Sequence, residues 1–68
     1  MSRDQKGFVM QLKRLRAQRG WSQAALSKRT GLTKEYIARL ELGQHDPSLS
    51  TLQKLAKALK VTVADLVE

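Results

Sequence analysis

The sequence has no cysteine, one proline and three aromatic residues among its 68 residues. Without cysteine the chain can form neither a disulfide nor a zinc site with thiolate ligands. The single histidine, His45, cannot build a metal site without several carboxylates around it. We therefore expect no metal and no cofactor, and stability that comes from the packing of apolar side chains.

Long apolar runs are also missing. The apolar residues occur in short periodic groups, whereas a membrane-spanning helix needs a run of about 18 or more. The N-terminus lacks the apolar segment of a signal peptide, so we expect a cytoplasmic protein that does not bind membranes. A chain of this length, 1–68, forms one small domain with little room for a catalytic cleft. No catalytic acid/base pair or phosphate-binding glycine loop is present, and we expect no enzyme.

Acidic residues are scarce, with six Asp and Glu against 13 Lys and Arg, which gives a formal net charge of +7. A polyanion such as nucleic acid is the natural partner of such a chain. Ribosomal proteins and membrane-surface peptides share this charge balance. The charge alone therefore does not decide the function.

Apolar side chains recur at helical spacing along the chain, beginning with the stripe of Phe8, Leu12 and Leu15. No segment has the pattern of a strand. Gly20 and Gly31 follow two of these segments, where glycine ends a helix at low steric cost. The predicted helices span about 4–19, 23–30, 34–42, 49–60 and 63–67.

Four hydroxyl residues precede predicted helices and can accept a hydrogen bond from their free N–H groups. These predicted N-caps are Ser22, Thr33, Ser48 and Thr62. Trp21 is expected to fill the core between the first two helices, and Leu32 to anchor the turn after the second.

The stretch 22–43 has the form of a helix-turn-helix, in which the second helix is presented to the major groove of DNA. Ile37 and Leu40 form the inward face of that second helix. Its outward face then carries Lys34, Glu35 and Arg39. These three side chains are the candidate base-reading residues.

The outward side chains have chemistry suited to base edges. Arg39 and Lys34 can donate to O6 and N7 of guanine, Arg39 with the better bidentate geometry. Glu35 has two readings: it accepts a hydrogen bond from a cytosine amino group, or it holds Arg39 four residues later in a productive rotamer. Ser22 and Gln23 lie at a helix N-terminus, which favours a backbone phosphate.

Three blocks of sequence, LKRLRAQRGWSQAALSKRTGL, TKEYIARLELG and DPSLSTLQKLAKALKVTVADL, occur in this order. Together they resemble the helix-turn-helix family of phage repressors and Cro proteins, also called the xenobiotic-response-element family. The resemblance covers about 8–66. It implies an all-α fold, a compact five-helix domain like that of lambda repressor, with the third helix in the major groove.

The resemblance also implies roles for single residues. Gln23 matches a glutamine that bonds a phosphate and braces the first residue of the recognition helix, and Lys34, Glu35 and Arg39 match base-contacting positions. Tyr36 matches a position that touches a sugar, a phosphate or a thymine methyl; its alternative is to pack beside the second helix with its hydroxyl in water. The expected backbone or mixed DNA contacts are Ser22, Gln23, Thr33, Tyr36, Gln44 and His45.

Arg16 and Glu41 match a pair that forms a structural salt bridge between the first and third helices of relatives. The chain departs from the family pattern at Leu42, where many relatives carry a phosphate-binding asparagine, and at Gln44, which replaces a basic residue. We expect that phosphate contact to be absent, or to come from Gln44, His45 or the backbone after Gly43. His45 is otherwise a solvated loop residue.

The C-terminal segment 61–68 is the expected dimer contact, because a short helix cannot easily bury all its apolar side chains internally. These residues are Val61, Val63, Leu66 and Val67, of which roughly half must close the core. A two-fold dimer could read a palindrome with half-sites about 34 Å apart.

The sequence predicts a transcriptional regulator that binds double-stranded DNA, such as a repressor, as a homodimer. The alternative is a protein-interaction module, for example an antitoxin, whose main role is to bind a partner protein.

Overall fold

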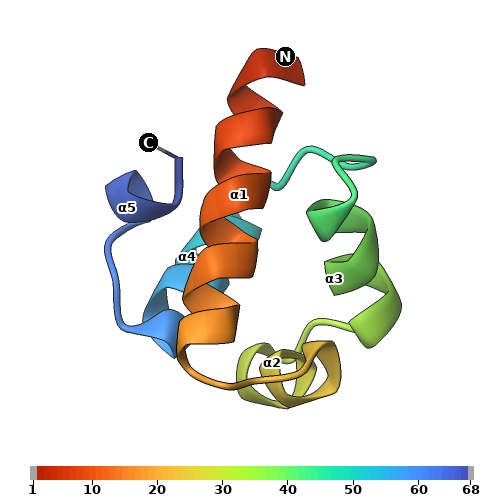
Figure 1. Cartoon of the computed structure of the whole chain (residues 1–68), viewed down its shortest axis with the longest axis vertical. Coiled ribbons are helices and arrows are strands. Elements are labelled where there is room, and N and C mark those ends of the chain that lie inside the picture. Colours follow the sequence, from red (N-terminus) through yellow and green to blue (C-terminus); the bar gives the residue numbers. More distant parts are fainter. Residues whose placement is uncertain (1, 68) are drawn as a thin grey trace.

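A computed structural model of the chain describes residues 2–67, which form five α-helices and no strand (Figure 1). The helices are α1 (Ser2–Gln18), α2 (Gln23–Thr30), α3 (Lys34–Glu41), α4 (Leu49–Leu59) and α5 (Val63–Val67). The predicted all-α, five-helix fold is confirmed, and each predicted helix boundary is correct to within two residues. Within residues 2–67, no helix is long and apolar enough to cross a membrane.

The core lies around α1, which packs against α5 on one side and α3 on the other (Figure 1). Helix α2 contacts α3 and α4, and α4 contacts α5. Trp21 is half-buried and packs against this core, in line with its predicted position. The buried apolar side chains are Phe8, Leu12, Leu15, Leu26, Ile37, Leu40, Leu55, Ala56, Leu59 and Leu66.

Leu49 departs from the predicted apolar stripe of the fourth helix, since it is 64% exposed. It is the first residue of α4. The inward face of that helix begins later, with half-buried Leu52 and buried Leu55. The helical spacing was correct, but the helix meets the core only after its first turn.

The four predicted N-caps are all present. The hydroxyls of Ser22, Thr33 and Ser48 each accept a hydrogen bond from the backbone N–H three residues later. Thr62 does the same for the Asp65 N–H at 3.0 Å, and the Asp65 carboxylate accepts the Thr62 N–H at 3.0 Å. This reciprocal pair fixes the start of α5.

Helices α1 to α4 are each followed by a residue in the left-handed conformation, whose N–H donates to one of the last carbonyls of the helix. Gly20 and Gly43 occupy that position with φ of 69° and 74°, but after α4 the position is held by Lys60 with φ of 60°. The N–H of Lys60 donates to the Lys57 carbonyl, and the next N–H, of Val61, donates to the Ala56 carbonyl. Lys60 therefore carries a steric cost that glycine avoids.

Replacing Lys60 with glycine is expected to raise the free energy of unfolding by about 1 kcal/mol, because the left-handed conformation is strained only for a residue with a Cβ. Urea unfolding followed by circular dichroism measures the change. The matched control is Lys54→Gly in the interior of α4, which should lower stability by about 1 kcal/mol. A loss of stability in both variants would contradict the steric explanation.

Candidate nucleic-acid interface

The three predicted base-reading residues share the exposed side of α3. Ile37 and Leu40 are fully buried and fix the helix on the core, so Lys34, Glu35 and Arg39 remain exposed. Among the side chains described, no ion pair joins Glu35 to Arg39. The reading in which Glu35 holds Arg39 has no support in the free protein, and the cytosine reading is untested.

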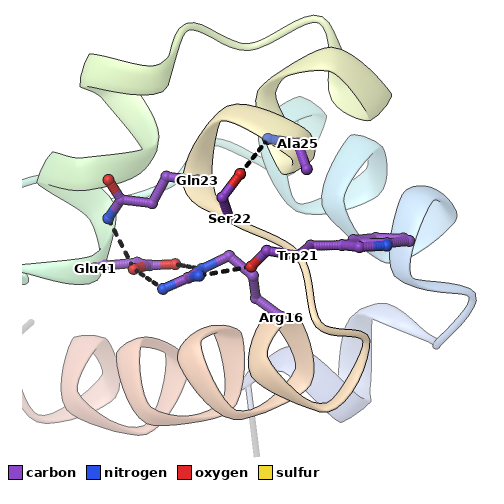
Figure 2. A network of polar contacts seen from close by, with 6 residues as sticks. All are labelled: Arg16, Trp21, Ser22, Gln23, Ala25 and Glu41. Atoms are coloured by element: carbon purple, nitrogen blue, oxygen red, sulfur yellow. Dashed lines mark hydrogen bonds and ion pairs between the residues drawn. The ribbon is translucent and has the colours of Figure 1, made fainter.

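The N-terminus of α2 is capped by Ser22, whose hydroxyl accepts the Ala25 N–H at 3.0 Å (Figure 2). Half-buried Gln23 follows, and its amide donates to Oε1 of Glu41 at 3.0 Å. The resemblance implied that Gln23 braces the first residue of α3, Lys34. Instead Gln23 braces the last residue of that helix, because the buried Glu41 carboxylate needs additional donors.

Arg16 and Glu41 form the ion pair that the resemblance implies. The Arg16 Nε lies 2.6 Å from Glu41 Oε2, and its Nη2 lies 2.9 Å from Oε1, so the contact is bidentate. A third nitrogen, Nη1, donates to the Trp21 carbonyl at 2.8 Å (Figure 2). The hydrogen bonds that Arg16 donates to the Glu41 carboxylate raise the pKa of Arg16 above its ordinary value.

This network joins three segments at one carboxylate. Arg16 comes from α1 and Gln23 from the start of α2, and both donate to Glu41 at the end of α3. The side chain of Glu41 is only 5% exposed and that of Arg16 is 20% exposed. The network thus sets the position of α3 relative to the two other helices.

Tyr36 fits neither expected environment fully. It is half-buried, and its hydroxyl lies 3.2 Å from Oγ1 of Thr51 in α4. The same Thr51 oxygen accepts a hydrogen bond from the Ser48 hydroxyl at 3.1 Å. The alternative that put the Tyr36 hydroxyl in water beside α2 is therefore wrong in the free protein. A contact between Tyr36 and DNA stays a prediction.

The rings of His45 and Tyr36 pack edge-on, with ring centroids 5.5 Å apart and an angle of 63° between the planes. It was expected to be a solvated loop residue, and it is exposed, but it also covers the tyrosine. Sequence reasoning missed Thr51, the buried hydroxyl that links α3 to α4. The sequence signal for Thr51 was its position three residues after the N-cap Ser48, where the two hydroxyls can bond.

The end of α3 is held by its backbone. The Gly43 N–H donates to the Leu40 carbonyl at 3.1 Å, and the Gln44 N–H donates to the Arg39 carbonyl at 3.0 Å. These two N–H groups are therefore already bonded within the protein. The side chains of Leu42 and Gln44 both face solvent, Leu42 with 70% of its surface exposed.

Most of the other basic residues lie on exposed helix faces, as predicted. Arg19 is the exception, because it is half-buried and donates to the backbone carbonyls of Leu59 and Leu15. Arg19 therefore ties the end of α1 to the end of α4, and its role is structural. Besides Lys34 and Arg39, the exposed basic residues that the structure describes are Lys13, Arg14, Lys28, Arg29, Lys54, Lys57 and Lys60.

The four apolar residues of the predicted dimer contact differ in exposure. Leu66 is fully buried and belongs to the core, while Val61 and Val63 are half-buried against it. Val67 is 45% exposed. The division agrees with the expectation that part of the segment closes the core, and it leaves Val67 as the most exposed of the four.

The chain is similar to known helix-turn-helix proteins. The family model described as Helix-turn-helix, HTH_3, matches residues 12–66. The chain is 38% identical over 56 residues to the transcriptional regulator SutR of Escherichia coli (strain K12), covering 82% of this chain and 32% of SutR. It is 36% identical over 56 residues to the immunity repressor of Bacillus phage phi105, covering 82% of this chain and 39% of the repressor.

A solved structure is similar over nearly its whole length. The restriction-modification controller protein C.AhdI from Aeromonas hydrophila matches with a TM-score of 0.88 and 36% identity, covering 93% of this chain and 96% of that one. In contrast, the chain spans only about a third of SutR and two fifths of the phage repressor.

Proposed function

Because this chain belongs to the helix-turn-helix family HTH_3, we propose that it is a DNA-binding transcriptional regulator that reads an operator in the major groove through α3. Proteins of this family are non-enzymatic, which agrees with the prediction that the chain is not an enzyme. We propose the cytoplasm as the location that corresponds to this role.

One observation supports this function best: α3 is anchored on the core by Ile37 and Leu40 while Lys34, Glu35 and Arg39 project into solvent. Basic side chains on one exposed helix face can enter the major groove and donate to base edges. Arg39 is proposed to contact guanine, and Glu35 to accept from cytosine.

Phosphate contacts would orient the protein on the duplex. The first N–H groups of α2 have no partner within the helix, so they offer a site for a backbone phosphate beside Ser22 and Gln23. Gln23 keeps its side-chain oxygen and backbone N–H for this contact while its amide nitrogen is bonded to Glu41. Thr33, Gln44 and His45 are the other proposed backbone contacts. Such contacts fix the register and do not select a sequence.

We further propose that the protein binds as a two-fold dimer through the segment 61–68, with Val67 at the contact. A single module of this size buries only about 600–1,000 Å² on DNA, which limits its affinity. Sedimentation equilibrium at tens of micromolar measures the mass in solution. A monomer that binds a single half-site would contradict the dimer.

The function is tested by selecting bound fragments from random duplex DNA. We expect enrichment of a palindrome with half-sites about one helical turn apart. Binding to the selected duplex should fall steeply with salt, with a log–log slope of about −0.9 for each neutralised phosphate. If no palindrome is enriched, the protein does not read an operator as a dimer. If the affinity does not depend on salt, the proposed phosphate contacts are wrong.

A further inference from the structure

An open hollow of about 400 Å³ lies between α2 and α4, away from the proposed base-reading residues. Its walls carry three cations, Arg29, Lys54 and Lys57, together with Thr30 and Ala58. Neither the proposed DNA contacts nor the core packing uses this group of charges.

Among the residues that the structure describes, no carboxylate forms an ion pair with the three cations. Among the described side chains, the single ion pair is that of Arg16 and Glu41. Lys54 and Lys57 are three residues apart, so they project from one face of α4, where like charges repel. A bound anion would relieve that repulsion.

Arg29 is held ready for such an anion. Its guanidinium carbon lies 4.3 Å from the centroid of the Trp21 ring. Stacking on an aromatic ring fixes the guanidinium plane and leaves the N–H groups at its edge free to bind two oxygens. In Figure 2 the Trp21 ring points away from the network of Arg16, Gln23 and Glu41.

The remaining wall residues give the hollow its shape. The Thr30 hydroxyl donates to the Leu26 carbonyl at 2.9 Å and accepts the Leu32 N–H at 3.1 Å, so its hydrogen bonds are already made. Ala58 packs partly against the core and provides an apolar surface. The binding groups are therefore the three cations.

The hollow is separate from the proposed phosphate contact at the start of α2. Six residues of helix, about 9 Å of rise, separate Gln23 from Arg29. Helix α4 contacts α2 and α5, whereas α3 contacts α1 and α2. A phosphate bound at Gln23 would therefore not reach the hollow.

We propose that this hollow binds the phosphate group of a small free ligand. Arg29 holds two phosphate oxygens, and Lys54 and Lys57 neutralise the charge. The same chemistry is available from the DNA backbone, but none of the proposed DNA-contact residues lines the hollow, which favours the free ligand. The site does not depend on the proposed reading of DNA by α3.

The test is a titration of the protein with sodium phosphate at constant ionic strength, maintained with sodium chloride. The fluorescence of Trp21, the single tryptophan, and the NMR shifts of the Arg29 and Lys54 amides report binding. We expect a saturable response that the double variant Lys54→Gln/Lys57→Gln weakens by about tenfold or more. The absence of a saturable response in both readouts would overturn the proposal.

The matched control is Lys13→Gln/Lys28→Gln, which removes the same charge from exposed positions outside the hollow. The affinity of this control for phosphate should equal that of the unmodified protein. If both double variants lose the same affinity, the effect comes from net charge alone and the proposed site is wrong. A second arm titrates a short DNA duplex. If only the Lys54 and Lys57 variant loses duplex binding, the phosphate comes from DNA, and the free-ligand assignment is wrong.

Discussion

Replacing Arg16 with methionine is expected to lower the free energy of unfolding by about 3 kcal/mol, because it leaves the buried Glu41 carboxylate without its charged partner. This value is the lower end of the range for breaking a buried pair, since Arg16 is 20% exposed. A domain of this size is stable by only about 5 kcal/mol, so a large fraction of its stability would be lost. Guanidinium unfolding followed by circular dichroism measures the effect.

A double variant separates the charge effect from the loss of packing. Arg16→Met combined with Glu41→Leu removes both charges, and it should recover more than half of the lost stability. Arg14→Met on the exposed face of α1 is the control, and it should change stability by less than about 0.5 kcal/mol. The single variant Glu41→Leu completes the cycle. If the stability losses of Arg16→Met and Glu41→Leu simply add in the double variant, the two side chains are not coupled.

Replacing Arg39 with alanine is expected to relax sequence preference at one base position in each half-site while the fold stays intact. One bidentate arginine–guanine contact contributes about 1–3 kcal/mol of discrimination, and a dimer would lose it twice. The variant should fold normally because Arg39 is exposed and its carbonyl, not its side chain, closes the end of α3. Selection from random duplex DNA, compared with the unmodified protein, measures the preference at each position.

Two further variants sharpen this prediction. Arg39→Lys keeps the charge but not the planar fork, so it should retain affinity for unselected DNA better than it retains the base preference. Lys28→Ala removes an exposed cation of α2 that is not one of the proposed base contacts, so any weakening should be equal across sequences. An unchanged preference in Arg39→Ala would remove Arg39 from the base-reading set.

The sequence predicted the helices well because their signals are local. Ser22 and Thr62 mark helix starts through hydrogen bonds that span three residues, and glycine ends helices through its own backbone freedom. Buried positions such as Ile37 and Leu40 followed from helical spacing. These features depend on neighbours in the chain, which the sequence lists directly.

The errors concern contacts between segments far apart in the chain. The Tyr36 hydroxyl bonds Thr51, 15 residues away, and Arg19 bonds a carbonyl 40 residues away. In the free protein the Gln23 amide bonds Glu41 at the last residue of α3, a contact that helical periodicity does not show. Arg16 and Glu41, 25 residues apart, were paired correctly only through the family resemblance.

The two ends of α3 are fixed before any ligand arrives, by Glu41 in the network with Arg16 and by Tyr36 at Thr51. The conformational entropy of ordering this helix is therefore lost during folding and not during association. Association with DNA should then bury surface without coupled folding, so its heat-capacity change should match a rigid interface. Calorimetric titrations with DNA at several temperatures would then show a binding enthalpy that becomes only modestly more negative as the temperature rises.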